Sequence, residues 1–495
     1  MEGPVLYLYV VVSLTTVLFY RWRFVNLHDI PTVGPTLPLF SYLGTYRFIR
    51  DNKAMIQEGY QKFKGGVFKV AMLNHWLVVI SGSKLIDEVR KLPEDQASLS
   101  HALDEFLQLH HSFGNGVLSE PLHIEVVRDQ LTRHISTFFD DFRDEITMSF
   151  NDLIPISAEW TPVNALQTMQ TIVARVSSRV FVGIPVCHNQ DYLKLSVNHT
   201  LAIAKTAEIM ACFPEMLKPL VSLFFDEGRR GNLEAKKYLG PLIEQRLNDM
   251  KRSGNVWSEK PDDMLQWFID LAVSKGKGID DIVGYMMLVN FASIHTSSTS
   301  FTHALYHLAA HPEYMHPLRE EVDAAINAEG WTKTAMQRMK KVDSFIRESL
   351  RLNGVDGLSL TRKAMKDITL SNGTFLPAGT VFAAASGPTH LDAENYPDPT
   401  VFDPWRFSKL REKEGEGNRH QIVGTAVDFI PFGHGRYACP GRFFAANELK
   451  AIFAHVVMNY DVKFENAGSR PEDIWFVSSV YPDPSAKVLF RKHCD

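Results

Sequence analysis

Apolar and polar positions divide the chain into an N-terminal apolar run, a mixed region, a long helical region and a second mixed region. Residues 67–70 and 76–80 are short apolar runs typical of buried strands. From about residue 125 to residue 352 the spacing of apolar positions indicates helices almost throughout. Strand patterns return at 368–370 and 374–376 around Ser371-Asn372-Gly373, which predicts a β-hairpin. The pattern favours one large, mainly α domain with a minor β portion.

The longest helix is predicted for residues 280–310. Asp280 suits its first turn, and Pro312 marks its end. The middle of this segment, residues 285–294, is apolar on most sides. A helix of that kind is typical of the interior of a large domain, so we expect it to be buried.

The N-terminal apolar run covers residues 5–20 and is interrupted only by one serine and two threonines. Arg21 and Arg23 follow it, and the run reaches transmembrane length, ~17–25 residues, if it extends to Val25. The positive flank places the rest of the chain on the cytoplasmic side. A cleaved signal peptide is the alternative, but no basic segment precedes the run and no small-residue cleavage site follows it. We therefore expect an anchor and flank at 1–29, a single-pass protein of the endoplasmic reticulum membrane, and a cytoplasmic domain at 30–495.

Charge and cysteine content narrow the function classes. The formal net charge of −5 gives no basic face of the kind that nucleic acid requires. The four cysteines include no CxxC pair, which argues against a disulfide framework and against a structural zinc site. A reducing compartment is expected.

The most specific stretch runs from residue 432 to residue 443, where two glycines, a lone cysteine and a proline follow one another closely. Gly433 and Gly435 favour a tight loop before Cys439, and Pro440 favours a helix start directly after it. A thiolate at that position would face unpaired backbone N–H groups and the positive end of the helix dipole. Both favour the ionised sulfur that metal ligation requires, so Cys439 is a candidate metal ligand.

This stretch has two other interpretations. An isolated cysteine is more often a small buried apolar residue than a ligand. The two glycines with Ala438 also fit a GxGxxA dinucleotide fingerprint, which needs a βαβ unit and an acidic residue ~20 positions later. Because the stretch lies close to the C-terminus and leads into a long helix, we reject dinucleotide binding.

Phe432, Gly435, Cys439 and Gly441 match FxxGxRxCxG, and in this stretch the chain resembles the cytochrome P-450 family. The resemblance implies the mainly helical P-450 fold and a haem b cofactor. It also implies that Cys439 is the thiolate ligand of the haem iron, which promotes cleavage of the O–O bond.

Two further motifs occur in the family's order. Glu348 and Arg351 form an ExxR on a predicted helix, where residues three apart share a face. Taken alone, this is an ordinary exposed ion pair. Arg406, in Phe402-Asp403-Pro404-Trp405-Arg406-Phe407, resembles the family's second arginine motif. The resemblance implies that the three residues form a structural triad behind the haem, with a role in folding and haem retention.

Arginines at two other positions resemble haem-propionate ligands. Arg362 and Arg128 occupy these positions, and a surface arginine is the alternative for each. Tyr437 stands where the family's signature has an arginine, and Arg436 lies one place earlier. This departure leaves one propionate contact in doubt.

Hydroxyl residues cluster in the middle of the longest helix, in Ala292-Ser293-Ile294-His295-Thr296-Ser297. The run resembles the family's oxygen-activating motif, with Thr296 at the threonine position and His295 in place of the acid. Imidazole can relay protons near neutral pH, so the resemblance implies proton delivery through Thr296 with His295 or water. The alternative is that the hydroxyls only bond to helix carbonyls and distort the helix. The Ile-His-Thr variant is similar to that of fungal terpenoid oxidases such as ent-kaurene oxidase and indole-diterpene oxidases.

The resemblance implies a haem-thiolate monooxygenase that inserts oxygen from O2 into a hydrophobic small molecule. A terpenoid or meroterpenoid of fungal secondary metabolism is the expected substrate. Electrons would come from NADPH through a membrane-bound reductase, and Arg436, Arg442 and Lys450 could form a basic docking face for it. Four residues stand at positions that line the pocket in relatives: Ser293, Leu358, Leu360 and Val480.

Two rival functions stay open at this point. A haem-thiolate isomerase or dehydratase that needs no external electrons is permitted by the missing acid at His295, although the retention of Thr296 argues against it. A non-catalytic haem-binding sensor or scaffold is disfavoured because the helix motif is otherwise complete.

Overall fold

The computed structural model describes residues 15, 27–37, 40–113, 115–213, 216–253, 257–466 and 468–493. Apart from Thr15, the apolar run that predicts an anchor lies outside these residues. Within the described part of the chain, no helix is long and apolar enough to cross a membrane.

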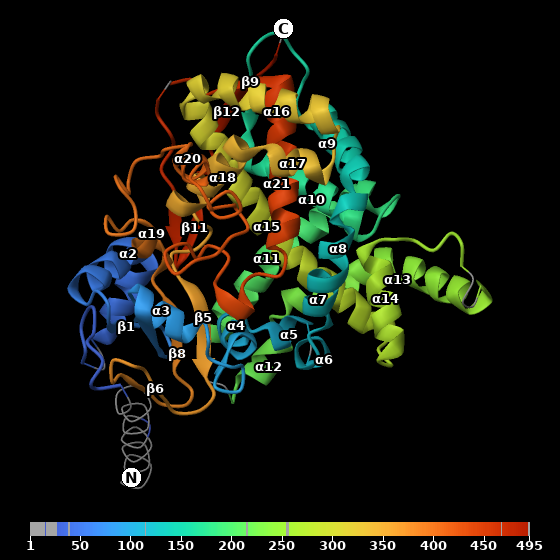
Figure 1. Cartoon of the computed structure of the whole chain (residues 1–495). Coiled ribbons are helices and arrows are strands. Elements are labelled where there is room, and N and C mark those ends of the chain that lie inside the picture. The colour runs from blue at the N-terminus through green and yellow to red at the C-terminus, as the bar shows by residue number, and fades with distance from the viewer. Residues whose placement is uncertain are drawn as a thin grey trace.

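Helix α15 (Ile279–Ala310) runs through the middle of the molecule, and other helices surround it (Figure 1). The backbone N–H of Gly278 donates a hydrogen bond to the Asp281 carboxylate at 3.0 Å and so caps its first turn. The helix ends before Pro312, which cannot continue it. Most of α15 is buried, and the predicted long buried helix is confirmed.

Several long helices pack around α15, mostly through apolar faces. The longer helices are α2 (Ser41–Lys62), α9 (Phe139–Leu153), α10 (Ala165–Phe181), α11 (Gln190–Ala211), α13 (Glu227–Ser253), α14 (Met264–Ser274), α16 (Met315–Glu329), α18 (Lys340–Leu352) and α21 (Arg442–Asn459). Shorter helices that bear on the site are α4 (Leu99–Leu107), α5 (Leu109–Phe113), α7 (Leu122–Glu125), the π-helix η1 (Val126–Leu131), α12 (Lys218–Ser222) and α20 (Arg406–Arg411).

The main sheet lies at one side of the helical part, with α2 and α3 (Ser83–Val89) beside it (Figure 1). Its strand order is β1-β2-β8-β5-β3, in which β1 (Val67–Ala71) pairs antiparallel with β2 (Trp76–Ile80). The other strands are β8 (Val381–Ala384), β5 (Ser359–Ala364) and β3 (Ala97–Ser98). Both predicted apolar strands are confirmed, because β1 and β2 are buried on both faces.

The predicted hairpin is also confirmed. Strand β6 (Ile368–Thr369) pairs antiparallel with β7 (Phe375–Leu376). Gly373 takes a φ of +85°, a conformation that glycine adopts without strain, and its N–H donates to the Leu370 carbonyl at 2.8 Å.

In the described part of the chain, residues 125–352 are helical almost throughout, as predicted, with one strand among the helices. Strand β4 (Thr161–Asn164) lies within that region and pairs antiparallel with β12 (Lys487–Lys492). Strand β12 also pairs with β9 (Tyr460–Lys463), which gives a three-stranded sheet with β12 in its centre.

Candidate active site around Cys439

The loop before α21 holds Cys439 by backbone contacts. The Cys439 N–H donates to the carbonyl of Phe432 at 2.8 Å, which closes the loop on itself. Gly435 has a φ of +76°, and a Cβ there would lie 3.0 Å from the backbone oxygen of Arg90. Glycine is therefore required at Gly435 both by conformation and by space. Helix α21 begins at Arg442, two residues after the predicted start.

The Cys439 thiol faces the start of α21. The backbone N–H groups of Gly441 and Arg442 donate to its sulfur, as expected at a helix N-terminus, and they lower its pKa. Burial raises the pKa by more, so the net direction is upward. Burial thus outweighs the effect of the helix N-terminus, and the protein alone does not favour the ionised sulfur. A bound metal cation would be needed to stabilise the thiolate.

The same thiol is accessible to solvent, although protein surrounds it closely enough for burial to raise its pKa. The two observations agree if the sulfur borders an internal hollow. A matching accessible surface occurs on α15, where Ala292 and Thr296 are exposed in the middle of a helix that is otherwise mostly buried. These residues are four apart and share one face of the helix. We infer that this face of α15 and the Cys439 loop border the hollow.

The Thr296 hydroxyl is held by its own helix. Its Oγ1 donates to the carbonyl of Ala292 at 2.7 Å and lies 3.3 Å from the carbonyl of Ser293. This contact leaves the lone pairs of Oγ1 free to accept a hydrogen bond from the hollow. The Ser293 hydroxyl lies nearby and is buried, and no described residue forms a hydrogen bond with it.

The His295 ring points away from the accessible face of α15. Its Nε2 bonds to the carbonyl of Val197 on α11 at 2.7 Å, and its Nδ1 lies 3.5 Å from the amide nitrogen of Gln170 on α10. The carbonyl requires Nε2 to be the donor, and burial lowers the pKa of His295, so the ring is neutral. Both ring nitrogens are occupied, and the relay role predicted for His295 finds no support in this geometry.

Basic side chains lie beside the Cys439 loop. Arg362 is 2% exposed; among the described residues its Nη1 donates only to the adjacent Thr361 carbonyl, and its Nε has no hydrogen-bond partner. Its guanidinium lies over the Tyr437 ring, with 5.0 Å between Cζ and the ring centroid. Tyr437, at the signature's arginine position, therefore stacks on the arginine that is predicted to bind a propionate.

Two further basic side chains belong to the segment that packs against Gly441. Val127 of η1 is the neighbour that a Cβ at Gly441 would meet, so η1 lies against the loop. Arg128 of η1 is exposed and close enough to Arg442 to affect its pKa. His123 of α7 has a buried Nδ1 that forms no hydrogen bond within the described part of the chain, and burial lowers the pKa of His123 to about 4.

Glu348, Arg351 and Arg406 meet in the interior. The Glu348 carboxylate accepts from Arg351 Nε and Nη2 at 2.8 and 2.7 Å and from Arg406 Nε at 3.0 Å. Arg351 also donates to the carbonyls of His390 and Pro399. The bridge therefore ties α18 to the segment that follows α19 (Ser386–His390), a structural connection rather than a surface ion pair.

Three of the predicted pocket residues are closely packed. Leu358, Leu360 and Val480 are 9%, 4% and 3% exposed. Leu360 takes a φ of +50° at a register irregularity between β5 and β8, which aims its side chain into the core beside the main sheet. Their role at a substrate pocket stays a prediction.

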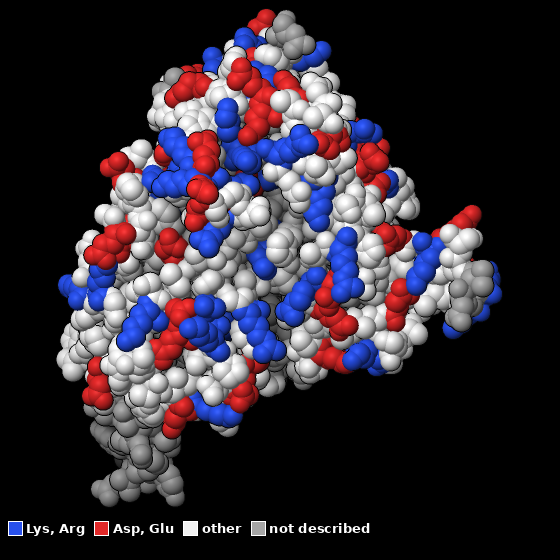
Figure 2. Space-filling view, in the orientation of Figure 1, with Lys and Arg blue, Asp and Glu red and all other residues white. Residues whose placement is uncertain are grey.

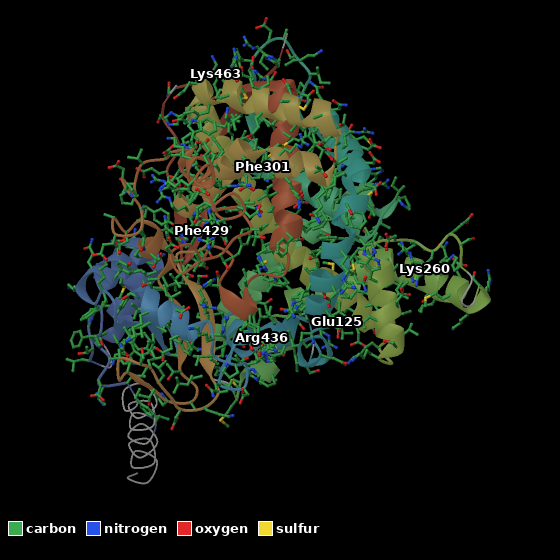
Figure 3. All side chains as sticks on the ribbon, in the orientation of Figure 1. Glu125, Lys260, Phe301, Phe429, Arg436 and Lys463 are labelled. Atoms are coloured by element: carbon green, nitrogen blue, oxygen red, sulfur yellow. The ribbon has the colours of Figure 1, made fainter. Side chains whose placement is uncertain are left out.

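The predicted basic docking face needs one correction. Lys450 is 6% exposed and paired with Asp343 at 2.7 Å, so it cannot meet a partner protein. Arg436 is exposed, and Figure 3 shows it on the near face, beside the loop that leads into α21. On the same face, Figure 2 shows Lys and Arg side chains gathered around a recess.

A solvent-open cavity of about 460 Å³ lies elsewhere, between α4, β2 and the turn before β8. Its lining is mostly polar and includes His101, Asp104, Glu105 and Lys363. None of the predicted site residues lines it. Such a lining does not suit a hydrophobic substrate.

The comparisons with known proteins agree with this geometry. The family model described as cytochrome P-450 matches residues 31–490. The chain belongs to the cytochrome P-450 family. It is 47% identical to cytochrome P-450 monooxygenase 151 of Postia placenta over 99% of this chain and 98% of that protein. It is 33% identical to the ent-kaurene oxidase of Gibberella intermedia, over 91% and 86% of the two chains.

A solved structure shows the same fold. Retinoic acid-bound cyanobacterial CYP120A1 superimposes with a TM-score of 0.70 over 94% of this chain and 99% of that one, at 18% identity. The cytochrome P-450 family uses haem with a cysteine thiolate ligand and electrons from a reductase. This protein is accordingly a member of a monooxygenase family.

The described residues fit a haem group. Cys439 offers an accessible sulfur, and Arg362 and His123 offer buried nitrogens that lack hydrogen-bond partners among the described residues, as anionic propionates require. Cys439 and Arg362 stand at positions that the sequence predicts to bind haem, but His123 does not. His123 lies five residues before Arg128 in the sequence. Its burial could not be predicted from the sequence.

Proposed function

We propose that this cytochrome P-450 inserts one oxygen atom from O2 into a hydrophobic terpenoid or meroterpenoid. The observation that carries the proposal is the pair of accessible surfaces inside the protein, the Cys439 thiol and the Ala292–Thr296 face of α15. A bound haem supplies the iron that activates O2. The thiolate of Cys439 would hold that iron, and the Thr296 hydroxyl is placed to accept and pass on a hydrogen-bonded proton.

The apolar walls around α15 support a hydrophobic substrate. Phe291, next to Ala292, meets Phe113 of α5 edge to face, with 6.4 Å between ring centroids. Val117 and Leu288 are also buried in this core. The likeness to ent-kaurene oxidase supports a terpenoid as the substrate class.

A membrane location on the cytoplasmic side of the endoplasmic reticulum is part of the proposal. Besides the apolar N-terminal run, α12 and its flanks expose a cluster of large apolar side chains. These are Met216, Leu217, Leu220, Leu223, Phe224 and Phe225, exposed by 47–92%. An apolar patch of this kind marks a surface that meets a membrane or a partner. A membrane also supplies lipophilic substrates.

Electron supply by an NADPH-dependent reductase completes the proposal. The exposed Arg436 and the basic side chains around the recess in Figure 2 would attract an acidic partner. Turnover that required the reductase would separate monooxygenation from isomerisation or dehydration.

The first test is the ferrous–CO difference spectrum of the purified full chain beside Cys439→Ala. A strongly red-shifted Soret band that the variant lacks is expected for thiolate ligation. A histidine-type band in the wild type, or no haem at all, would refute the proposal. Incubation of the loaded wild type with terpenoid substrates, O2, NADPH and reductase then tests the reaction, and ¹⁸O₂ label in the product identifies oxygen insertion.

A further inference from the structure

A glutamate, a cysteine and a histidine meet between α9 and the segment that joins α10 to α11. Glu145 lies on α9, and Cys187 and His188 belong to the short helix η3 (Val186–His188) directly before α11. Helices α9 and α10 lie beside each other, away from the main sheet (Figure 1). One ligand atom from each of the three residues lies within 4.8 Å of the other two. In the described part of the chain, no other group of three or more histidine, cysteine or carboxylate side chains is this close.

The Glu145 carboxylate is held in place by its neighbours. It is buried, its Oε1 accepts a hydrogen bond from Arg175 Nε at 2.8 Å, and its Oε2 lies 2.8 Å from His188 Nε2. A partner that binds one carboxylate oxygen and orients the other is typical of metal sites. Cys187 is buried with a free thiol, whereas the His188 side chain is 33% exposed. The cluster is therefore mostly enclosed, with a way in for an ion on the His188 side.

The charges around the cluster suit a divalent cation. Arg175 pairs both with the glutamate of the cluster and with Asp152, at 2.7 Å, so two carboxylates share one guanidinium and leave one negative charge. Arg179, which also acts on the cysteine of the cluster, is neutralised by Asp141 at 2.5 Å. A thiolate would add a second negative charge. An ion of charge +2 then makes the cluster neutral, which a buried site requires.

The ligand types indicate which ion would bind. Burial and the charge of Glu145 raise the pKa of Cys187 to about 11, so without a cation the thiol keeps its proton at neutral pH. A coordinated metal ion deprotonates such a thiol. Thiolate and imidazole ligands favour Zn²⁺ over Mg²⁺ and Ca²⁺, which prefer oxygen. Atoms bound to one tetrahedral Zn²⁺ lie about 3.3–3.6 Å apart, so shifts on the order of 1 Å bring the three ligand atoms into place.

We propose that Glu145, Cys187 and His188 form a Zn²⁺ site, with water as the fourth ligand. When the ion binds, the Cys187 S–H bond breaks, any proton on the ligating histidine nitrogen also leaves, and both protons go to solvent. No electron is transferred. Because η3 leads directly into α11, the ion ties α9 to the start of that helix, and it stabilises the native state to which it binds.

The first test measures zinc in the haem-loaded, tag-free full chain, in which the haem iron occupies Cys439. The protein is incubated with excess Zn²⁺ and a phosphine reductant, dialysed against metal-free buffer and analysed by mass spectrometry. We expect about one retained zinc ion per chain, which excess Mg²⁺ does not displace. X-ray absorption at the zinc edge should show one sulfur at about 2.3 Å and nitrogen or oxygen ligands at about 2.0–2.2 Å.

Ligand variants and matched controls then locate the ion. Cys187→Ser and His188→Asn should each weaken zinc binding by more than the roughly 10–100-fold that loss of an outer partner costs. The control for the cysteine is Cys212→Ser, at an exposed thiol, and the control for the histidine is His316→Asn, at an exposed ring near Glu320. Both controls should keep about one zinc ion per chain. Zn²⁺ should raise the unfolding temperature of the wild type and of the controls, but not that of His188→Asn.

A wild type that retains no zinc, or a zinc spectrum without sulfur, would overturn the inference. Wild-type zinc affinity in His188→Asn would do the same. If Cys187→Ser does not fold, the wild-type spectrum and His188→Asn still decide the question, because the His188 side chain is partly exposed and its replacement leaves the buried thiol in place. Neither zinc content nor its ligand spectrum depends on product formation, so a failure here is distinct from a failure of the proposed monooxygenation.

Discussion

The Glu348 carboxylate accepts two hydrogen bonds from the Arg351 guanidinium, at 2.7 and 2.8 Å, where both side chains are 0% exposed. The two residues lie three apart on α18, so a local helical contact places one charged group directly against the other. Arg406 then adds a bond from a part of the chain more than fifty residues later.

A variant that lacks one partner of the Glu348–Arg351 pair should be less stable than the wild type. We expect Arg351→Ala to lower the free energy of unfolding by about 3–5 kcal/mol, because among the described residues it leaves the buried Glu348 carboxylate with Arg406 as its one cationic partner. Urea denaturation of the haem-free full chain measures the effect. The matched control is Arg419→Ala, which breaks an exposed pair with Glu416 and should cost about 0–1 kcal/mol. Equal losses in the two variants would contradict the structural role of the triad.

Substitution of Thr296 should uncouple electron use from product formation. Thr296→Ala removes a hydroxyl that borders the hollow, so we expect product per NADPH to fall roughly tenfold or more, given that positioned proton transfer contributes about 10²–10⁴-fold. Thr296→Ser keeps the hydroxyl and should retain most of the coupling. The measurement is product and peroxide per NADPH consumed at saturating reductase. Full coupling in Thr296→Ala would rule out a role in proton delivery.

Burial raises the pKa of Glu448 on α21, which predicts a pH dependence of stability. Its pKa rises from 4.5 when exposed to about 7 when folded, so between these values the native state holds a proton that the unfolded state has lost. Stability from this group therefore falls as the pH rises from about 4.5 to about 7, by up to roughly 3 kcal/mol. Glu448→Gln should remove this part of the dependence, and its advantage over the wild type should be largest at pH 8. Parallel unfolding curves at all pH values would show that Glu448 does not titrate.

The apolar cluster around α12 should enter a lipid bilayer. Phe224 is 68% exposed, and we expect Phe224→Trp in the full chain to add fluorescence that brominated phospholipids quench. Val401→Trp, at another site that is 56% exposed, serves as the control and should not be quenched. Equal quenching at the two sites would argue against insertion of the α12 segment.

Elements with strong local patterns could be predicted from the sequence. Short apolar runs predict strands β1 and β2, and a turn sequence predicts the β6–β7 hairpin. A long helical pattern predicts α15. Strand β4 could not, because it is four residues long, contains Pro162 and owes its pairing to residues more than three hundred positions away. Intrinsic β-propensity does not predict a strand whose pairing depends on such distant residues.

The candidate site likewise contains residues that stand in local sequence motifs and residues whose surroundings depend on distant parts of the chain. Cys439 and the ExxR pair stand in motifs, so the sequence indicated them, and the structure brings Glu348 into contact with both arginines. The burial of Lys450 depends on Asp343 of another helix. The environment of Glu448 likewise depends on Ser177 and Ser297, which come from two further helices. Spatial neighbours of this kind leave no trace in the local pattern of residues.

The central place of β12 has a consequence for synthesis of the protein. On the ribosome, β4 and β9 emerge before the strand that must lie between them, so their sheet cannot close until β12 has emerged as well. Until then β4 and β9 each have unpaired backbone edges that can pair with the wrong strand. A frameshift or premature stop near residue 487 would therefore remove the middle of a sheet rather than its margin, and the nascent chain would be a target for chaperones and proteases.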